Sequence, residues 1–223
     1  MDEPPPGPTT LRIDFVSDVV CPWCAIGLAS LEQALERTRD VLQATVHIQP
    51  FELNPQLGPV GEDAMEHLQA KYGMPPAQVA ANQEAIRARG AALGFTFDMA
   101  RRRRIWNTFD AHRLLHWAGL EGRQRDLKHA LLRAYFTDGR NIADHDTLAD
   151  IAATSGLPRD PARDVLATNA YAEEVRADEA FFQRHGIQAV PAIIIERRHL
   201  ISGGQPVEVF ERALREIAGA KRD

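Results

Sequence analysis

Alternating apolar and polar positions mark the first predicted elements of the chain. Residues 11–16, Leu-Arg-Ile-Asp-Phe-Val, alternate and are rich in β-branched and aromatic side chains, which predicts a strand. Residues 25–39 carry leucines at helical spacing with Glu and Arg between them, which predicts an amphipathic helix. Residues 44–51 alternate again and predict a second strand, parallel to the first. Strand, helix and strand in this order form a βαβ unit.

The middle of the chain has a different pattern. Residues 57–186 consist of apolar stretches at helical spacing that glycines separate, and glycine is typical of the position just past a helix end. We therefore predict six or seven helices there. A strand pattern returns at residues 187–195 and briefly at 200–202, and Pro206 then precedes a last amphipathic helix.

The order βαβ, helical segment, ββα predicts an α/β chain with a thioredoxin-like fold and a large all-helical insertion. Residues 11–56 and 187–220 would form the thioredoxin-like domain, and residues 57–186 the inserted helical domain. The proline-rich residues 1–10 would form a disordered lead-in.

Composition and charge exclude several classes of protein. The 223 residues are 44 % hydrophobic and 26 % charged, as in an ordinary globular protein, and the net charge of −5 gives no basis for nucleic-acid binding. The N-terminus lacks the basic and apolar regions of a signal peptide, and no apolar run approaches the roughly 18–20 residues that span a bilayer. We expect a cytoplasmic protein with neither nucleic-acid nor membrane partners.

Both cysteines of the chain, Cys21 and Cys24, lie in the sequence CPWC between the first strand and the first helix. Three interpretations compete: a structural disulfide, half of a metal site, or a redox pair. A disulfide here would close a very short loop, which gains little from cross-linking. Zinc would need two further ligands, and the candidates His112 and His116 lie about ninety residues away, far from the spacing of small zinc modules. The spacing favours a redox pair, with no metal and no organic cofactor.

The position of Cys21 at the start of a helix indicates its chemistry. Disulfide exchange requires a thiolate, and the free amides and positive dipole end of a helix N-terminus stabilise that anion. We therefore assign Cys21 as the nucleophile and Cys24, one helical turn further in, as the resolving thiol. Pro22 is compatible with the first helical turn, and Pro22 and Trp23 would set how strongly the reduced pair is stabilised.

A second feature is Val190-Pro191, at a point where a proline precedes a buried strand. A cis bond here would expose the backbone of Val190 opposite Cys21, where an extended thiol-bearing peptide could pair with it. In contrast, we interpret the run Arg101 to Arg104 as a solvated helix start rather than a phosphate site.

Residues 18–27, Asp-Val-Val-Cys-Pro-Trp-Cys-Ala-Ile-Gly, resemble the active-site segment of the DsbA superfamily, specifically its FrnE-like branch. The resemblance implies a thioredoxin fold with an inserted helical domain and dithiol–disulfide oxidoreductase or isomerase activity. It also implies Cys21 as nucleophile, Cys24 as its partner and Pro191 as a cis-proline, although Ala192 and Ile193 replace the usual aromatic residues. Further matching stretches are residues 50–55, 107–108, 111–114, 134–136, 186–191 and 202–205.

The same superfamily includes glutathione-dependent proteins similar to 2-hydroxychromene-2-carboxylate isomerase and kappa-class glutathione transferase. Those relatives typically have serine at the nucleophile position, so the two cysteines here favour dithiol chemistry. Glutathione nevertheless remains a candidate co-substrate, and His112 is a candidate for lining the substrate groove. Positions that resemble the glutathione contacts of the relatives are Val190, Asn54, Gly203, Gly204 and Gln205.

Taken together, the sequence favours a thiol–disulfide oxidoreductase or isomerase that acts on a disulfide- or thiol-containing protein or small molecule. One alternative is a glutathione-dependent isomerase or transferase with a small aromatic or polyketide-like substrate. Another is a non-enzymatic binding protein switched by oxidation. An exposed face of the helical segment would allow a homodimer.

Overall fold

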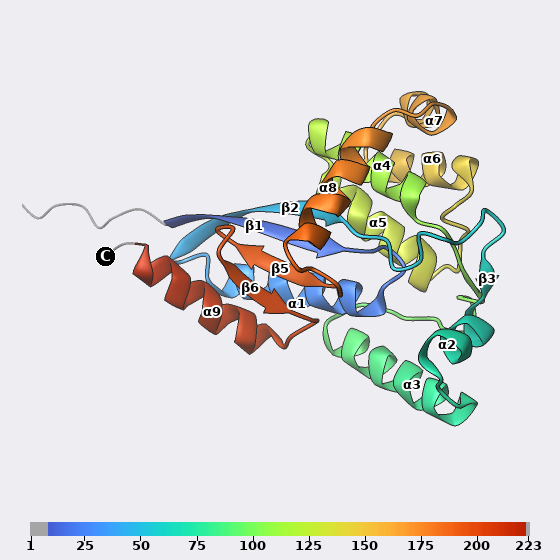
Figure 1. The fold of residues 1–223 in the computed structure, drawn as a ribbon. Helices are drawn as coiled ribbons and strands as arrows, with labels where there is room; N and C mark the ends of the chain where they lie inside the picture. The colour runs from blue at the N-terminus through green and yellow to red at the C-terminus, as the bar shows by residue number, and fades with distance from the viewer. Residues whose placement is uncertain (1–8, 222–223) are drawn as a thin grey trace, which may run out of the picture.

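A four-stranded mixed sheet forms the centre of the structure, a computed structural model that describes residues 9–221. The strand order is β2-β1-β5-β6, with β1 and β2 parallel and the other neighbours antiparallel (Figure 1). Together with helix α1 after β1 and helix α9 after β6, this is the predicted thioredoxin-like βαβ…ββα arrangement. The elements are β1 (Thr9–Ser17), α1 (Pro22–Arg37), β2 (Leu42–Pro50), β5 (Ala192–Ile195), β6 (His199–Ser202) and α9 (Val207–Ala220).

The alternation of β1 separates its side chains onto the two faces of the sheet. Leu11, Ile13 and Phe15 are fully buried in the main core, which also contains the apolar positions of α1 and α9. On the opposite face, Val16 packs with Phe182 in a smaller cluster. Helices α1 and α9 thus cover one face, and α8 (Ala172–Arg184) crosses the other (Figure 1).

The segment between β2 and β5 contains seven helices among the described residues, and all but α8 form two groups. Helices α4 to α7 lie on one side of the sheet, and α2 and α3 lie on the other, near the start of α1 (Figure 1). A small antiparallel sheet, not predicted from the pattern, pairs β3 with β4. The remaining elements are β3 (Glu62–Asp63), α2 (Ala64–Tyr72), α3 (Pro76–Ala92), β4 (Arg104–Ile105), α4 (Phe109–Leu120), α5 (Gln124–Phe136), α6 (His145–Thr154) and α7 (Arg159–Ala167).

Local sequence signals fix the ends of several of these helices. The side chain of Asp63 accepts hydrogen bonds from the first amides of α2, and Asp144 does the same for α6. Such N-caps contribute about 1 kcal/mol each to helix stability. Gly73 ends α2 in the left-handed conformation, with φ of 63°, that favours glycine. Gly94, Gly156 and Gly186 also follow helix ends, as the pattern predicted, whereas Gly119 lies inside α4.

Several boundaries differ from the prediction. Thr9 and Thr10 pair with β2, so β1 begins two residues before the predicted start, and the rest of the predicted lead-in, residues 1–8, lies outside the described residues. In contrast, α1 begins at Pro22 with Cys21 as its N-cap, in agreement with the predicted place of the motif. The strand predicted for residues 187–195 begins only at Ala192, after the turn that contains Pro191. The arginine run is not a helix start: Arg104 lies in β4, and Arg102 is buried.

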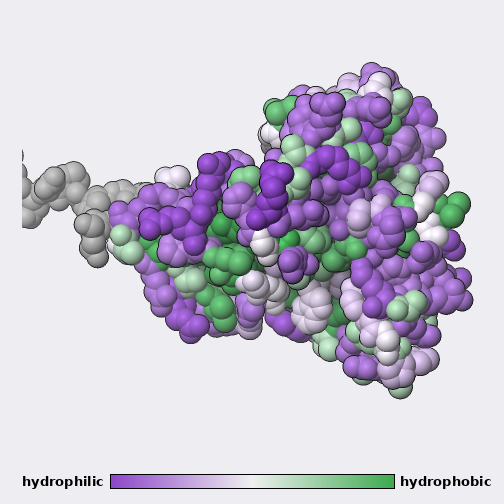
Figure 2. All heavy atoms as spheres, viewed as in Figure 1, coloured by the Kyte–Doolittle hydropathy of each residue, from purple (hydrophilic) through white to green (hydrophobic). Residues whose placement is uncertain are grey.

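Polar residues cover most of the face of the molecule shown in Figure 2, and apolar side chains gather over β5 and β6. Leu200 of β6 is among the exposed apolar residues. Within residues 9–221, no helix has both the length and the apolar character required to cross a bilayer.

A candidate redox site at the start of helix α1

The turn between β1 and α1 holds Cys21 at the N-terminus of the helix. Its backbone is extended, with φ of −89° and ψ of 114°, and its carbonyl accepts hydrogen bonds from the amides of Cys24 and Ala25. Pro22 occupies the first helical turn, where its missing N–H costs no intrahelical hydrogen bond. The backbone therefore places Cys21 at the amide end of α1, where the sequence predicted it.

The Cys21 sulfur lies in surroundings that favour its thiolate. A hydrogen bond from the Cys24 side chain and the backbone amides of Cys24 and Trp23 together outweigh the effect of burial, so the pKa of Cys21 lies below its ordinary value. The negative charge of Asp18 acts in the opposite direction. Since the thiolate is the nucleophile of disulfide exchange, this environment makes Cys21 the more reactive sulfur.

Cys24 lies in the opposite environment. It is fully buried, and burial, together with the hydrogen bond and charge of Cys21, raises its pKa well above the ordinary value. The positive charge of Lys128 counteracts this shift. Both cysteines are free thiols in this structure. The two sulfurs therefore differ: the environment favours the thiolate form of Cys21 and the thiol form of Cys24.

Behind Cys24 lie three buried ionisable side chains from different elements. Asp18 precedes the motif, His112 belongs to α4, and Lys128 belongs to α5. The Asp18 Oδ1 and His112 Nε2 atoms are 3.4 Å apart without hydrogen-bond alignment, and the Lys128 Nζ atom has no hydrogen-bond partner. Burying incompletely paired ionisable groups costs several kcal/mol, so their position beside a reactive thiol marks them as candidate functional groups.

The charges of this cluster influence one another. Burial raises the pKa of Asp18, but His112, the backbone amide of Leu53 and the charge of Lys128 outweigh it, so the pKa lies below the ordinary value. The Leu53 amide donates to Asp18 Oδ2 at 2.7 Å. Burial lowers the pKa of Lys128, against the charges of Cys24, Asp18 and Cys21. Asp18 therefore remains a carboxylate close to the dithiol.

Sequence reasoning did not single out Asp18 or Lys128 as functional residues. The available signal for Lys128 was its place between Leu127 and Leu131, on the apolar face of a predicted helix. The signal for Asp18 was weaker, because an acidic residue near a turn is common. Their juxtaposition depends on how α5 packs beside β2, which the local sequence does not specify.

In front of Cys21 lies a cavity of about 700 Å³. The Cys21 sulfur lies 3.6 Å from the carbonyl oxygen of Val190, and the bond between Val190 and Pro191 is cis, as the resemblance implied. Asn54 also lines the cavity, and its Oδ1 atom accepts hydrogen bonds from Lys71 Nζ at 2.6 Å. The structure thus brings Cys21, Val190 and Asn54 to one cavity, as predicted for a substrate site.

The turn of residues 203–205 lies on another side of α1 and does not line this cavity. A Cβ atom on Gly204 would come within 2.8 Å of the Trp23 carbonyl oxygen, so this turn packs directly against the CPWC segment. Arg89 of α3 donates to the Gly204 carbonyl at 2.8 Å and lies 5.2 Å from the ring of the partly exposed Trp23. Gly203 and Gln205 belong to the same turn, which therefore has a packing role here.

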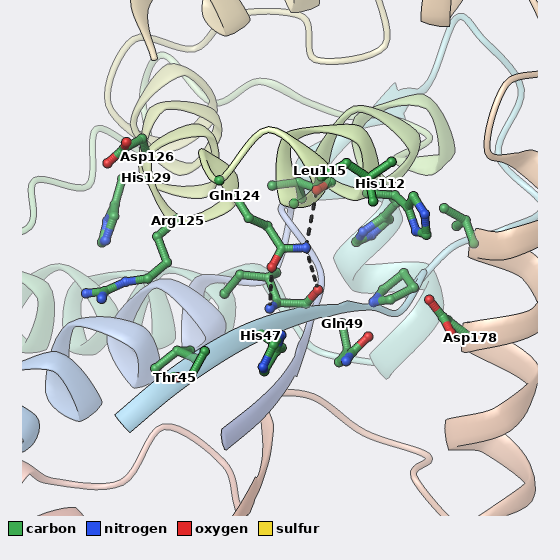
Figure 3. Close-up of a pocket in the computed structure, with 18 residues that line it drawn as sticks. Thr45, His47, Gln49, His112, Leu115, Gln124, Arg125, Asp126, His129 and Asp178 are labelled. Carbon is green, nitrogen blue, oxygen red and sulfur yellow. Dashed lines mark hydrogen bonds between the residues drawn. The ribbon is translucent and has the colours of Figure 1, made fainter. Parts of the chain in front are cut away.

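His112 does not line the Cys21 cavity either. It lines a second cavity, of about 750 Å³, between β2 and helices α4, α5 and α8 (Figure 3). This cavity is polar and contains no thiol. On its wall, the Gln124 side chain accepts a hydrogen bond from the amide of Ile48 and donates one to the carbonyl of Ile48, as the dashed lines in Figure 3 show. His116, the other candidate zinc ligand, also lines it, and residues 9–221 contain no cluster of three His, Cys, Asp or Glu side chains able to hold a metal ion.

Comparison with known proteins shows similarity to DsbA-like proteins over almost the whole chain. Residues 12–215 match the DSBA-like thioredoxin domain. The structure of a probable DsbA oxidoreductase from Streptomyces coelicolor is 38 % identical, has a TM-score of 0.88, and covers 96 % of this chain and 92 % of that chain. An uncharacterized Bacillus subtilis protein, YwbO, is 28 % identical over 92 % of this chain and 96 % of its own length. The cytosolic disulfide reductase DsbM from Pseudomonas aeruginosa, solved with GSH, shares the fold at 19 % identity, with a TM-score of 0.64 and coverage of 92 % and 98 %.

Proposed function

The chain belongs to the DSBA-like thioredoxin family, and from this premise we propose that it is a thiol–disulfide oxidoreductase with Cys21 as nucleophile and Cys24 as resolving thiol. The observation that supports this proposal most strongly is the opposite environment of the two sulfurs. Cys21 has a lowered pKa and faces a cavity, whereas Cys24 has a raised pKa and is fully buried.

In the first step, the Cys21 thiolate attacks one sulfur of a substrate disulfide. A bond forms between Cys21 and that sulfur, and the other substrate sulfur leaves as a thiolate. The carbonyl of Val190, 3.6 Å from the Cys21 sulfur, provides a backbone acceptor beside the reacting atoms. An extended substrate segment could hydrogen-bond to it while its sulfur approaches Cys21.

In the second step, Cys24 resolves the mixed disulfide. Once Cys21 is bonded to substrate, it no longer carries the negative charge that raises the pKa of Cys24. Lys128 continues to favour the Cys24 thiolate, which attacks the Cys21 sulfur and releases the substrate as a second thiolate. Two electrons pass from the enzyme dithiol to the substrate, and the reverse sequence oxidises a substrate dithiol.

Trapping of the mixed disulfide tests this division of labour. We expect Cys24→Ser to accumulate a stable adduct with a disulfide-containing substrate, because the attacking sulfur is present and the resolving sulfur is absent. Cys21→Ser should accumulate none, because its remaining thiol is buried and poorly ionised. The adduct is measured by intact mass spectrometry under non-reducing conditions. Equal trapping on both variants would contradict the assignment, and absence of an adduct on either would favour the redox-switched binding protein.

A glutathione-dependent isomerase is the second candidate, and the largely apolar cavity beside Cys21 favours it. That cavity could hold a small aromatic molecule next to the Cys21 sulfur. This function requires only one cysteine, so it predicts activity that survives Cys24→Ala and depends on glutathione. Loss of turnover in Cys24→Ala would exclude it and leave the dithiol mechanism.

Glutathione is also the co-substrate we propose for restoring the dithiol, with support from the fold relative solved with GSH. That relative is a cytosolic disulfide reductase, which supports our prediction of a cytoplasmic location for this chain. Its other predicted partner is a disulfide- or thiol-containing protein or small molecule. Redox titration of Trp23 fluorescence against glutathione would measure whether the pair equilibrates with that thiol.

A further inference from the structure

The cavity in front of Cys21 contains a buried arginine with no anionic partner. Arg102 is 7 % exposed, lines this cavity, and forms none of the ion pairs found among the described residues. Its Nε atom donates to the hydroxyl of Tyr135 at 3.1 Å. The guanidinium also lies 5.6 Å from the Tyr135 ring and 5.8 Å from the Phe136 ring. The protein therefore holds this cation in place with aromatic groups and one neutral hydroxyl.

A second cation, the more exposed Lys71, lines the same cavity. The Lys71 ammonium donates to the carbonyl of Leu53 at 2.7 Å and to the side-chain oxygen of Asn54 at 2.6 Å. Both acceptors are neutral, and no carboxylate lies within ion-pair distance of Lys71 in the described part of the chain. Two cations thus border one cavity without a counter-ion of their own.

The acidic lining of the cavity does not neutralise them. Glu52 is the acidic residue among those that line it. Its Oε2 atom pairs with Arg176, and its buried Oε1 atom forms no hydrogen bond with either cation. Holding a nearly buried cation without an anion is costly, and a guanidinium binds a carboxylate through paired, charge-assisted hydrogen bonds. A ligand carboxylate would supply the missing charge. The remaining walls are mostly apolar, which strengthens such an interaction.

We propose that Arg102 and Lys71 form a carboxylate-binding subsite that selects small thiols carrying a carboxylate as reaction partners of Cys21. This inference rests on the proposed function. The cavity volume of about 700 Å³ suits a small molecule rather than a folded partner. The carboxylate binds at the cation pair, and the ligand sulfur reaches Cys21 in the same cavity.

Two ligand thiols reduce the oxidised enzyme in two exchange steps. The ligand thiolate attacks Cys21 of the oxidised enzyme, forms a mixed disulfide, and releases Cys24 as a thiolate that takes up a proton. A second ligand thiolate attacks the ligand sulfur of that mixed disulfide and releases Cys21 as a thiolate. The two ligand thiols are oxidised to one disulfide, and the enzyme disulfide is reduced.

The test compares 3-mercaptopropionate with its methyl ester, a pair that differs in the carboxylate charge. The rate constant for reduction of the oxidised full-length protein is followed by Trp23 fluorescence and divided by the thiolate concentration of each reagent. We expect wild type to react about tenfold faster with the acid, the ratio typical of one charge-assisted hydrogen-bonded contact. Arg102→Gln should bring the ratio close to one, and Lys71→Met should lower it severalfold.

Arg103→Gln is the matched control, because it removes the same charge from the exposed neighbouring position and should keep the wild-type ratio. Equal rates of acid and ester with wild type would overturn the subsite alone, since the dithiol would still react. Failure of both thiols to reduce the wild-type disulfide would overturn the proposed function as well. An acid-to-ester rate ratio that stays at the wild-type value in Arg102→Gln would also overturn the subsite. If Arg102→Gln does not fold, an unchanged ratio in Lys71→Met would overturn it instead.

Discussion

The regions on the two sides of the dithiol differ in the charges they contain and in their access to solvent. In front of Cys21 is a cavity with mostly apolar walls and two cations without counter-ions. Behind Cys24 is a cluster of a carboxylate, an imidazole and an ammonium group, all buried, of which His112 also lines the second cavity. One helical turn, from Cys21 to Cys24, thus separates a sulfur beside mostly apolar walls from a sulfur beside buried charges.

The largest expected effect is the difference in alkylation rate between the two sulfurs. At pH 7 we expect iodoacetamide to modify Cys21 far faster than Cys24, because the pKa of Cys21 is lowered and burial raises that of Cys24. The rate at Cys21 should reach half its maximum below the pH of an ordinary free thiol, because its pKa is lowered. Peptide mass spectrometry at early time points measures both rates. Equal modification would abolish the distinction between front and back.

Asp18→Asn should weaken the region behind the dithiol by removing its carboxylate charge. We expect the free energy of unfolding to fall by about 2–3 kcal/mol, because Lys128 loses a partner charge in a buried site. Urea denaturation at neutral pH measures this loss. Asp126→Asn, which removes an exposed carboxylate paired with Arg123, is the control and should cost less than about 0.5 kcal/mol.

The stabilisation by the Asp18 charge is lost at low pH. The pKa of Asp18 is lower in the folded state than in the unfolded state, so its charge stabilises the fold above the unfolded value of about 3.9. This stabilisation disappears as the pH falls through the folded value. The difference in unfolding free energy between wild type and Asp18→Asn should therefore be full at neutral pH and shrink below about pH 4. A difference independent of pH would show that the charge is not its source.

Lys128→Met should separate stability from catalysis. We expect resolution of the mixed disulfide to slow, because the ammonium no longer lowers the pKa of Cys24. The pH at which resolution reaches half its maximum should rise. The unfolding free energy should fall less than in Asp18→Asn, because the Nζ atom has no hydrogen-bond partner among the described residues and the Leu53 amide still donates to Asp18. Stopped-flow release of a chromophoric thiol measures resolution.

Arg133→Met is the matched control for Lys128→Met. It replaces a cation on the exposed side of the same helix, α5, and should resolve mixed disulfides at the wild-type rate. Identical resolution rates in both variants would assign Lys128 no role in the chemistry.

The smallest expected effect concerns the contact that holds the front of the site to α3. Arg89→Met removes the guanidinium that lies over the Trp23 ring and donates to Gly204. We expect a loss of about 1 kcal/mol in unfolding free energy and a change in Trp23 fluorescence. An unchanged emission spectrum would show that α3 does not constrain the CPWC turn.

The fold could be predicted from sequence because its signals are local. Periodicities of two and of 3.6 residues specified the strands, α1 and the helical segment, and glycines marked several helix ends. The place of Cys21 at the start of α1 followed from the same signals. The cis bond before Pro191 agrees with the family resemblance rather than with any local pattern.

The charged side chains around the dithiol could not be predicted in the same way. Lys128 lies more than one hundred residues after Cys24, and its burial depends on the packing of α5. The arginine run was misread for a related reason: a local rule assigns four successive arginines to solvent, whereas the ring of Tyr135 covers Arg102. The packing of the turn at Gly204 against Trp23 likewise has no local sequence signal. Local patterns specify elements, and tertiary packing decides which polar groups meet.

The Gln124 side chain also has a consequence for how this protein behaves in concentrated solution. β2 is an outer strand of the sheet, and such strands can recruit neighbouring molecules into aggregates. Because one side-chain amide occupies both the N–H and the C=O of Ile48, an incoming chain cannot form a continuous ladder there. Any intermolecular extension of the sheet is thereby directed to the opposite border, at β6.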